Sequence, residues 1–425
     1  MLKIKKVPTV VSLQQLDQPS SDEPSKKPGL LNSEGLIGHK MPQFRCPVNS
    51  AGRSIRRNFS VDDLSVVPKF DSGSSSGSDS DSEGNRATWT DDDEGLAPKS
   101  LFDTVCLSEW EDRADKGLFR YDVTACSTRI IPGKLGILAQ LNEGRAQKKR
   151  PTEFRVDQVC QAFDESKFNF KKAAQNEALF QFGVSSNIKG SQFDDIAEIP
   201  EDVSLVVINV SPIEYGHILL VPKVLHSLPQ RITHGTLNLA AEMCAASNNA
   251  YFRVGYNSLG AYATINHLHF QAYYLMAPFP VELANTRALP IRKRKRVDVT
   301  CVDGYPVRGL VFTAEQSREI MSNAVADACV TLQEMNVPFN LLIVDGGNRI
   351  FLFPQCFAEK QAKGLVPEHI LDTQVNPASF EICGHLVLKR QEDYDNMTES
   401  FAEELLSQVS LNKRDFEDLC QTLFG

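Results

Sequence analysis

Hydrophobic positions are distributed unevenly along the chain, and the first hundred residues show no sustained period. This part contains a serine- and aspartate-rich run at 71–84 and a second acidic run at 91–94. Such a composition buries too little apolar area to offset the entropy of ordering the chain. We therefore expect residues 1–100 to form a largely disordered arm, with order beginning near Phe102, where apolar residues return.

The next part of the chain alternates between strand-like and helix-like patterns. Strand-like patterns cover residues 133–141, 203–212, 218–221, 251–257 and 268–275. The second and third of these flank a turn at Glu214-Tyr-Gly, which predicts a hairpin. Residues 233–247 have helical spacing, and Thr233 is a suitable N-cap for this helix.

A similar alternation recurs toward the C-terminus. After a polar linker at 285–297 come a helix around 315–335, a hairpin with strands 339–344 and 349–353 about Asp345-Gly-Gly-Asn, and a strand-like segment at 381–389. The last segment echoes residues 215–223, which suggests two related halves. We expect an α+β fold with antiparallel sheets and flanking helices. Its parts are the arm at 1–100, a catalytic half at 101–290 and a second, degenerate half at 291–425.

Charge and cysteine content narrow the classes of partner. The net charge of −9 and the pI near 5.5 argue against a general nucleic-acid binder, which is usually basic. The ten cysteines form no CxxC pair, which argues against a zinc ribbon or a redox dithiol. The most apolar windows have strand length, far short of the ~20 residues of a membrane helix. No stretch near the N-terminus has signal-peptide character. We expect a cytoplasmic protein that binds neither nucleic acid nor membrane.

The most informative segment is Asn266-His-Leu-His-Phe-Gln-Ala-Tyr273. Side chains alternate between the two faces of a strand, so we expect His267, His269 and Gln271 on one face and apolar residues on the other. Three interpretations are open: a solvated polar face, a zinc site at the two histidines, or nucleophilic catalysis. A neutral imidazole attacks phosphorus well when a hydrogen bond to its other nitrogen fixes the tautomer.

These motifs resemble those of a known family. The run His-Leu-His-Phe-Gln resembles the signature of the galactose-1-phosphate uridylyltransferase branch of the histidine-triad superfamily, in which glutamine replaces the third histidine of the hydrolases. Gly216–Lys223 is similar to the strand before the helix in that superfamily, and Gly255–Gly260 to its asparagine-containing loop near the nucleotide phosphate. Other segments resemble the plant GDP-L-galactose phosphorylases: the first twelve residues, 119–126, 140–145, 149–156 and 374–377. This resemblance covers about 102–400 but not the acidic, serine-rich insert.

The resemblance implies a phosphorylase that converts GDP-L-galactose and inorganic phosphate into L-galactose 1-phosphate and GDP, a step of L-ascorbate biosynthesis. It implies His269 as the nucleophile that carries a GMP–histidine intermediate, His267 as the residue that orients it, and Gln271 as the group that holds a phosphate oxygen. It implies no metal and no cofactor. The substrate-binding candidates are Asn257, Gly260, His217, Arg145 and Lys149.

Two alternatives stay open. One is a GDP-D-glucose phosphorylase, which acts on the same nucleotide with another hexose. The other is a nuclear regulatory protein that uses the fold as a nucleotide sensor. The basic run Arg292–Arg296 motivates it as a site for an import factor, although a solvated linker accounts for the run equally well. An intact set of His267, His269 and Gln271 argues against a pure sensor. The hexose preference and the oligomeric state are not fixed by the sequence.

Overall fold

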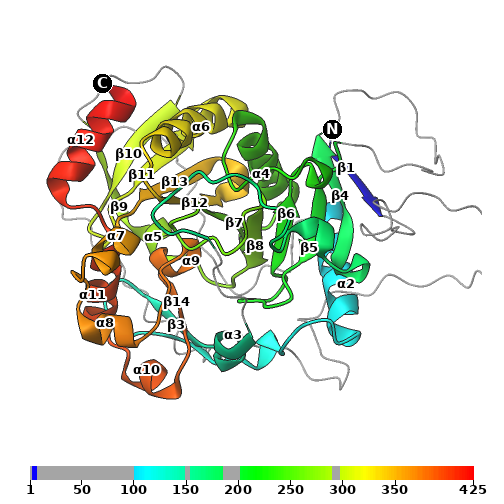
Figure 1. Ribbon diagram of the computed structural model, residues 1–425, viewed down its shortest axis with the longest axis horizontal. Helices are drawn as coiled ribbons and strands as arrows, with labels where there is room; N and C mark the ends of the chain where they lie inside the picture. The colour runs from blue at the N-terminus through cyan, green and yellow to red at the C-terminus, as the bar shows by residue number, and fades with distance from the viewer. Residues whose placement is uncertain (1, 7–99, 149–153, 185–201, 290–296) are drawn as a thin grey trace, which may run out of the picture.

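The computed structural model describes residues 2–6, 100–148, 154–184, 202–289 and 297–425. Eleven strands of these residues form one sheet, in the order β1-β4-β5-β6-β8-β7-β12-β13-β11-β10-β9, and all neighbours are antiparallel (Figure 1). The strands are β1 (Leu2–Lys6), β4 (Ala178–Val184), β5 (Leu205–Ile208), β6 (Ile218–Val221), β7 (Phe252–Asn257), β8 (Phe270–Tyr274), β9 (Asn285–Ala288), β10 (Val297–Asp303), β11 (Leu310–Ala314), β12 (Phe339–Val344) and β13 (Arg349–Pro354).

The sheet is symmetric about its central pair, β7 and β12. On one side the first strand group contains β4, β5, β6, helix α4 (His234–Ala246), β7 and β8; on the other the second strand group contains β9, β10, β11, helix α6 (Arg318–Glu334), β12 and β13. The two groups have the same chain order and mirrored places in the sheet. Gly255 faces Leu342 across the centre; Gln271 pairs with Gly255, and Phe351 pairs with Leu342. The fold is thus α+β with antiparallel sheets and flanking helices, as expected from the sequence. The segment 381–389, which echoes residues 215–223, contributes β14 (His385–Leu388) to a separate small sheet, and the counterpart of β6 in the second group is β11.

Long helices cover one face of the sheet. Helices α4 and α6 lie along it (Figure 1), and their apolar sides join those of α2 (Leu101–Asp115) and α12 (Lys413–Phe424) in the larger core cluster. The Thr233 hydroxyl caps α4 by accepting from the Thr236 N–H, as its sequence predicts. Ser317 caps α6 in the same way. Such caps satisfy N–H groups that have no partner inside the helix.

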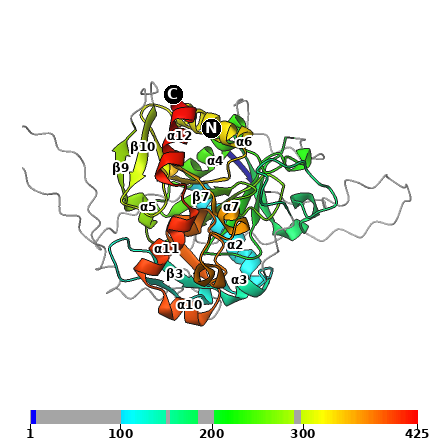
Figure 2. The ribbon, with the colours of Figure 1, turned by 60° about the vertical axis from the view of Figure 1, so that its left-hand side comes forward.

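Helices from the C-terminal part of the chain and a small three-stranded sheet cover the opposite face, mainly over the second strand group. They are α7 (Phe357–Ala362), α8 (Glu368–Asp372), α9 (Ser379–Ile382), α10 (Gln391–Asn396), α11 (Glu399–Val409) and a small sheet of β14 (His385–Leu388), β3 (Leu138–Leu141) and β2 (Thr128–Ile130). Figure 2 shows β3 beside α10. Phe351 and Phe353 pack here in the second core cluster.

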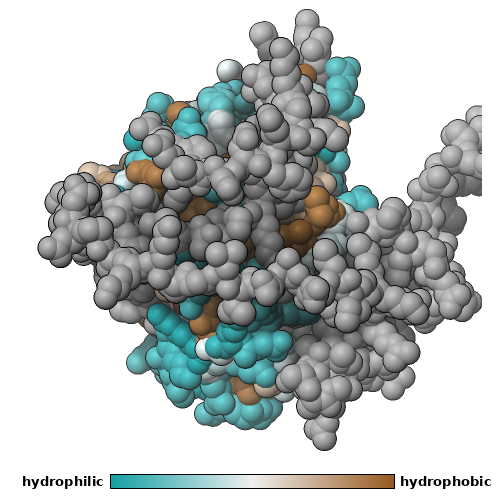
Figure 3. Space-filling view, turned by 90° about the vertical axis from the view of Figure 1, so that its right-hand side faces the viewer, coloured by the Kyte–Doolittle hydropathy of each residue, from teal (hydrophilic) through white to brown (hydrophobic). Residues whose placement is uncertain are grey.

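Shorter elements connect the strands and helices of both groups. They are α3 (Glu143–Lys148), α5 (Pro280–Leu283) and the 3-10 turns at Val123–Ala125, Phe170–Lys172, Gln175–Glu177, Val224–His226 and Asp345–Gly347. Figure 3 shows the end of the molecule at β4 and α2. Among the described residues there, hydrophilic groups dominate below and hydrophobic groups gather across the middle. No helix of the described residues is long and apolar enough to span a membrane.

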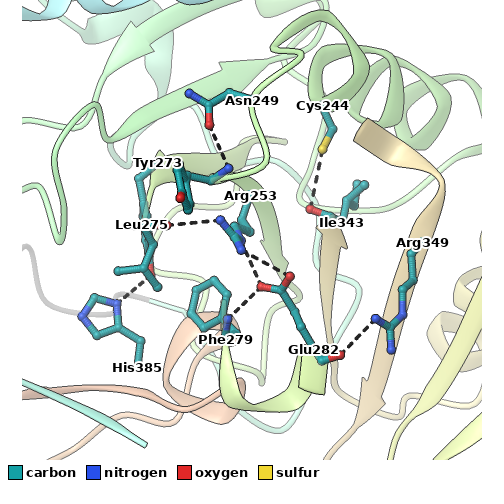
Figure 4. Close-up of polar contacts among 11 residues, drawn as sticks. Cys244, Asn249, Arg253, Tyr273, Leu275, Phe279, Glu282, Ile343, Arg349 and His385 are labelled. Carbon is teal, nitrogen blue, oxygen red and sulfur yellow. Dashed lines mark hydrogen bonds and ion pairs between the residues drawn. The ribbon is translucent and has the colours of Figure 1, made fainter. Parts of the chain in front are cut away.

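Helix α5 joins the two strand groups through a buried ion pair (Figure 4). Nε of Arg253, on β7, lies 2.9 Å from the Glu282 carboxylate, and both side chains are nearly inaccessible to solvent. The backbone carbonyl of Glu282 accepts a hydrogen bond from Arg349, on β13, at 3.1 Å. Glu282 therefore links β7 of the first strand group to β13 of the second.

Two sequence predictions differ from the structure, and the arm contributes one strand. Residues 285–297 were expected to be a linker, but Asn285–Ala288 form β9, which pairs with β10 while its side chains stay exposed. The strand expected at 133–141 is shorter in the structure, where it covers only Leu138–Leu141. Within the arm, which was expected to be largely disordered, Leu2–Lys6 form β1 and pair with β4. The rest of the arm, residues 7–99, lies outside the described residues, as does the basic run Arg292–Arg296.

Candidate active site

The face of the first strand group opens into a cavity that encloses about 880 Å³, part of it open to solvent. Its polar lining residues are Arg120, Arg145, Glu177, Asn209, Ser211, Asn257, Tyr262, Thr264, His269, Gln271 and Glu381. His269 and Gln271, which the sequence placed on one strand face, therefore meet in the same cavity. Because β8 begins only at Phe270, His269 stands at its entrance rather than within the strand.

The tautomer of His269 is fixed by the backbone. Its Nδ1 lies 2.8 Å from the carbonyl oxygen of His267, and a carbonyl can only accept, so Nδ1 carries the ring proton. The lone pair of the imidazole is then on Nε2. Burial lowers the pKa of His269 to about 4, although the hydrogen bond to the His267 carbonyl opposes this shift. At neutral pH the residue is an uncharged imidazole with a free nitrogen, as a nucleophile requires.

His267 differs from its predicted position. We expected its side chain on the same face as His269 and Gln271, but it does not line the cavity. Residues 266–269 precede β8, so strand alternation does not apply to them. The buried ring packs near Phe163 and Phe170, and its Nδ1 accepts the Phe170 N–H at 3.0 Å. Burial, with the nearby His269 and Lys171, lowers the pKa of His267 to about 3. Its direct contact with His269 is through the backbone carbonyl.

Gln271 and His217 form a second polar pair beside the nucleophile. His217 is fully buried, and its Nδ1 accepts the Ile213 N–H at 2.8 Å, so its proton is on Nε2. The His217 ring is hydrogen-bonded to Gln271, and burial lowers its pKa well below 6.5. The Nε2 of His217 also lies 3.2 Å from the Nδ2 of Asn209, another residue that lines the cavity. His217 thus orients Gln271 and holds its own hairpin, without lining the cavity itself.

Asn257 ends β7 at the cavity wall. Its Oδ1 accepts from Asn340 Nδ2 at 2.6 Å and from the Ser379 N–H at 2.8 Å. Because the oxygen is occupied, the amide nitrogen is the group left for a ligand. Helix α9 reaches this point because residue 255 is glycine: a Cβ there would lie 2.9 Å from the Ser379 hydroxyl oxygen.

The remaining substrate-binding candidates, Arg145, Lys149 and Gly260, have different outcomes. Arg145, on α3, lines the cavity and hydrogen-bonds the Ser211 carbonyl. Arg120, which sequence reasoning missed, lines it as well, and its guanidinium bonds the Lys148 carbonyl. Lys149 lies outside the described residues. Gly260 does not line the cavity; its φ of 80° and the Val156 carbonyl, 2.8 Å from a would-be Cβ, explain why glycine stands there.

Sequence reasoning also missed Gln230. This buried side chain bonds the backbone of His269 on both sides: Oε1 accepts the N–H at 2.9 Å, and Nε2 donates to the carbonyl at 3.1 Å. A lone glutamine in the loop before α4 carries no sequence signal, because its partners are backbone groups distant in the chain. Among the described residues, no cluster of His, Cys, Asp or Glu side chains is arranged to hold a metal ion.

Two family models cover most of the described chain. The N-terminal domain of the GDPGP1-like family matches residues 101–273, and its C-terminal domain matches residues 280–425. The chain belongs to the GDPGP1-like family. Placement of this GDPGP1-like chain in the histidine-triad superfamily stays a prediction.

Named relatives of this GDPGP1-like chain fall into two groups. It is 47% identical to GDP-L-galactose phosphorylase 1 of Arabidopsis thaliana and 46% identical to phosphorylase 2 of the same plant; each match covers 100% of the chain, with 89% and 90% of the relatives. It is 33% identical to human GDP-D-glucose phosphorylase 1, over 76% of this chain and 83% of that protein. The resemblance to the plant GDP-L-galactose phosphorylases, stated from the motifs, is therefore confirmed.

Proposed function

We propose that this chain is a GDP-L-galactose phosphorylase that works through a GMP–histidine intermediate on His269. The observation that carries the chemistry is the fixed tautomer: Nδ1 is bound to the His267 carbonyl, and Nε2 is free in a cavity lined by two arginines. The match to the plant enzymes over the whole chain, at 47% identity against 33% for the human GDP-D-glucose enzyme, favours L-galactose as the sugar.

In the first step the Nε2 lone pair attacks the phosphorus bonded to guanosine. The bond between that phosphorus and the bridging oxygen breaks, and L-galactose 1-phosphate leaves with the electron pair. The imidazole needs no base to remove a proton, because Nε2 carries none. The proton stays on Nδ1, where it is hydrogen-bonded to the His267 carbonyl oxygen. This hydrogen bond stabilises the positive charge that the ring acquires when Nε2 bonds to phosphorus.

In the second step an oxygen of inorganic phosphate attacks the same phosphorus. The N–P bond breaks, GDP leaves and the lone pair returns to Nε2. Arg145 and Arg120 supply positive charge where three phosphate groups meet in the course of the cycle. The amide groups of Gln271 and Asn257 donate to non-bridging oxygens without adding a titrating group.

The decisive experiment follows the half-reaction. Purified protein given GDP-L-galactose without phosphate should gain the mass of one GMP on His269, and added phosphate should release GDP. The same incubation with GDP-D-glucose and GDP-D-mannose measures the hexose preference. An adduct on another residue would contradict the assignment of the nucleophile, and faster turnover of GDP-D-glucose would contradict the assignment of the sugar.

A further inference from the structure

We propose that Gln230 is a positioning residue for the nucleotidyl transfer, because its carboxamide sets the backbone from which His269 aims its imidazole. The inference rests on the proposed function. It adds a residue from a different part of the chain, the loop between the turn at Val224–His226 and α4.

The carboxamide takes the place of a missing strand neighbour. The ladder between β7 and β8 ends at Gly255 and Gln271, so the backbone groups of Asn257 and His269 have no partner in it. Gln230 fills that gap. Its Nε2 donates to the carbonyl of Asn257 at 2.9 Å and to that of His269 at 3.1 Å, and its Oε1 accepts the His269 N–H at 2.9 Å.

Gln230 is itself held on both sides, so it can transmit a defined geometry. Its backbone N–H donates to Asn266 Oδ1 at 2.9 Å, and its carbonyl accepts the Tyr256 hydroxyl at 3.1 Å. Only 1% of the residue is exposed. The oxygen and nitrogen of the carboxamide are not interchangeable here, because one must accept from an N–H while the other donates to two carbonyls.

Gln230 determines the direction in which the His269 imidazole points, and it does not change the reactivity of the ring. The His267 carbonyl that fixes the tautomer belongs to the same short segment, residues 266–269, that Gln230 holds. If the segment shifts, the Nε2 lone pair points away from phosphorus even though the ring stays neutral. A misplacement of about 1 Å can lower a rate about 100-fold.

Gln333 provides a matched control. It is another buried glutamine, 6% exposed, that bonds one backbone on both sides: its Oε1 accepts the Ile232 N–H at 2.6 Å, and its Nε2 donates to the Ile232 carbonyl at 3.1 Å. Ile232 lies in the same loop as Gln230, two residues further along the chain, so Gln333 holds the same loop. Gln333 forms no hydrogen bond with His269. Gln333→Leu therefore reproduces the loss of buried hydrogen bonds without touching the nucleophile.

The test compares GMP–enzyme formation in a single turnover, GDP binding by calorimetry and melting temperature in the full chain. Gln230→Leu should slow adduct formation about 100-fold while the Kd for GDP changes less than about threefold. Gln333→Leu should lower the melting temperature comparably, with adduct formation within about threefold of wild type. Equal slowing in both variants, or a wild-type rate in Gln230→Leu, would overturn the positioning role.

If the Gln230→Leu variant does not fold, Gln230→Glu provides a second test. Its carboxyl group has the same size but can donate to a carbonyl only when protonated, so adduct formation should recover as the pH falls from about 8 to 5. A flat profile at the wild-type level would contradict the proposal. Wild-type protein that forms no adduct at all would instead contradict the proposed function, and with it this inference.

Discussion

The two strand groups share one topology but differ in what covers the same sheet face. Over the first group that face opens into the cavity with His269 and Gln271; over the second, α7 to α11 and the small sheet fill the space. The register places Phe351 where the first group has Gln271, and Arg349 where it has His269. The second group therefore has a hydrophobic core where the first has a site.

The connections before the corresponding strands explain the difference. Residues 258–269 form a long loop between β7 and β8, and His269 ends it without a ladder partner. Between β12 and β13 the connection is only the turn at 345–348, and Arg349 is paired directly with Val344. A residue freed from the ladder can be aimed by side chains such as Gln230, whereas a paired residue is fixed by its strand.

The largest expected effect separates His269 from its counterpart. His269→Asn removes the nucleophile and should lower phosphorolysis by several orders of magnitude, with GDP binding much less affected, because the base, ribose and phosphates hold the nucleotide. Arg349→Gln should keep kcat/KM within about threefold. Steady-state kinetics of both variants check this. A comparable loss in both would show that the second strand group takes part in catalysis.

The next effect tests whether the groups unfold together. Arg253→Met leaves the Glu282 carboxylate buried without its partner, which should cost about 3 kcal/mol of unfolding free energy. Because α5 is tied to both β7 and β13, we expect a single denaturation transition at lower denaturant. Guanidinium titration followed by fluorescence and circular dichroism measures this. Two separated transitions would indicate that the groups are independent.

A third pair of substitutions compares the corresponding positions on β8 and β13. Gln271→Ala removes a donor to the transferred phosphoryl group and should lower kcat about 100-fold. Phe351→Leu should do the reverse, lowering stability by about 1 kcal/mol without changing kcat. Kinetics and thermal melts on both variants suffice. If Gln271→Ala keeps the wild-type kcat, the role of Gln271 is packing rather than catalysis.

Much of the fold could be predicted from pattern alone. The hairpin of β5 and β6, the helix capped by Thr233 and the hairpin of β12 and β13 lie close to where the sequence indicates, because each has strong local signals. Strand β9 was missed because its four side chains are all exposed, so pairing with β10 leaves no hydrophobic alternation. The symmetric sheet order was likewise invisible, since it depends on the contact between β7 and β12.

The site was predictable only where chemistry is local. The motif led to His269 and Gln271, which do line the cavity, but strand alternation misplaced His267, because the backbone leaves the ladder before β8. Arg120, Gln230 and Asn340 could not be found this way. They reach the site from segments far apart in sequence, and each acts through a partner that only the fold supplies.

The smallest expected effect is an absence of change with pH. Burial holds the pKa of His269 near 4, so the nucleophile stays neutral and GMP–enzyme formation from GDP-L-galactose should be flat between about pH 8 and 5. Stability should behave differently. His217, His267 and His269 bind protons in the unfolded chain near pH 6.5 but not in the folded one, so unfolding is favoured as the pH falls from 6.5 toward 4. Adduct rates in single turnovers, set beside melting temperatures over the same range, separate the two. A loss of adduct formation centred near pH 6.5 in protein that is still folded would mean that His269 titrates like an exposed histidine.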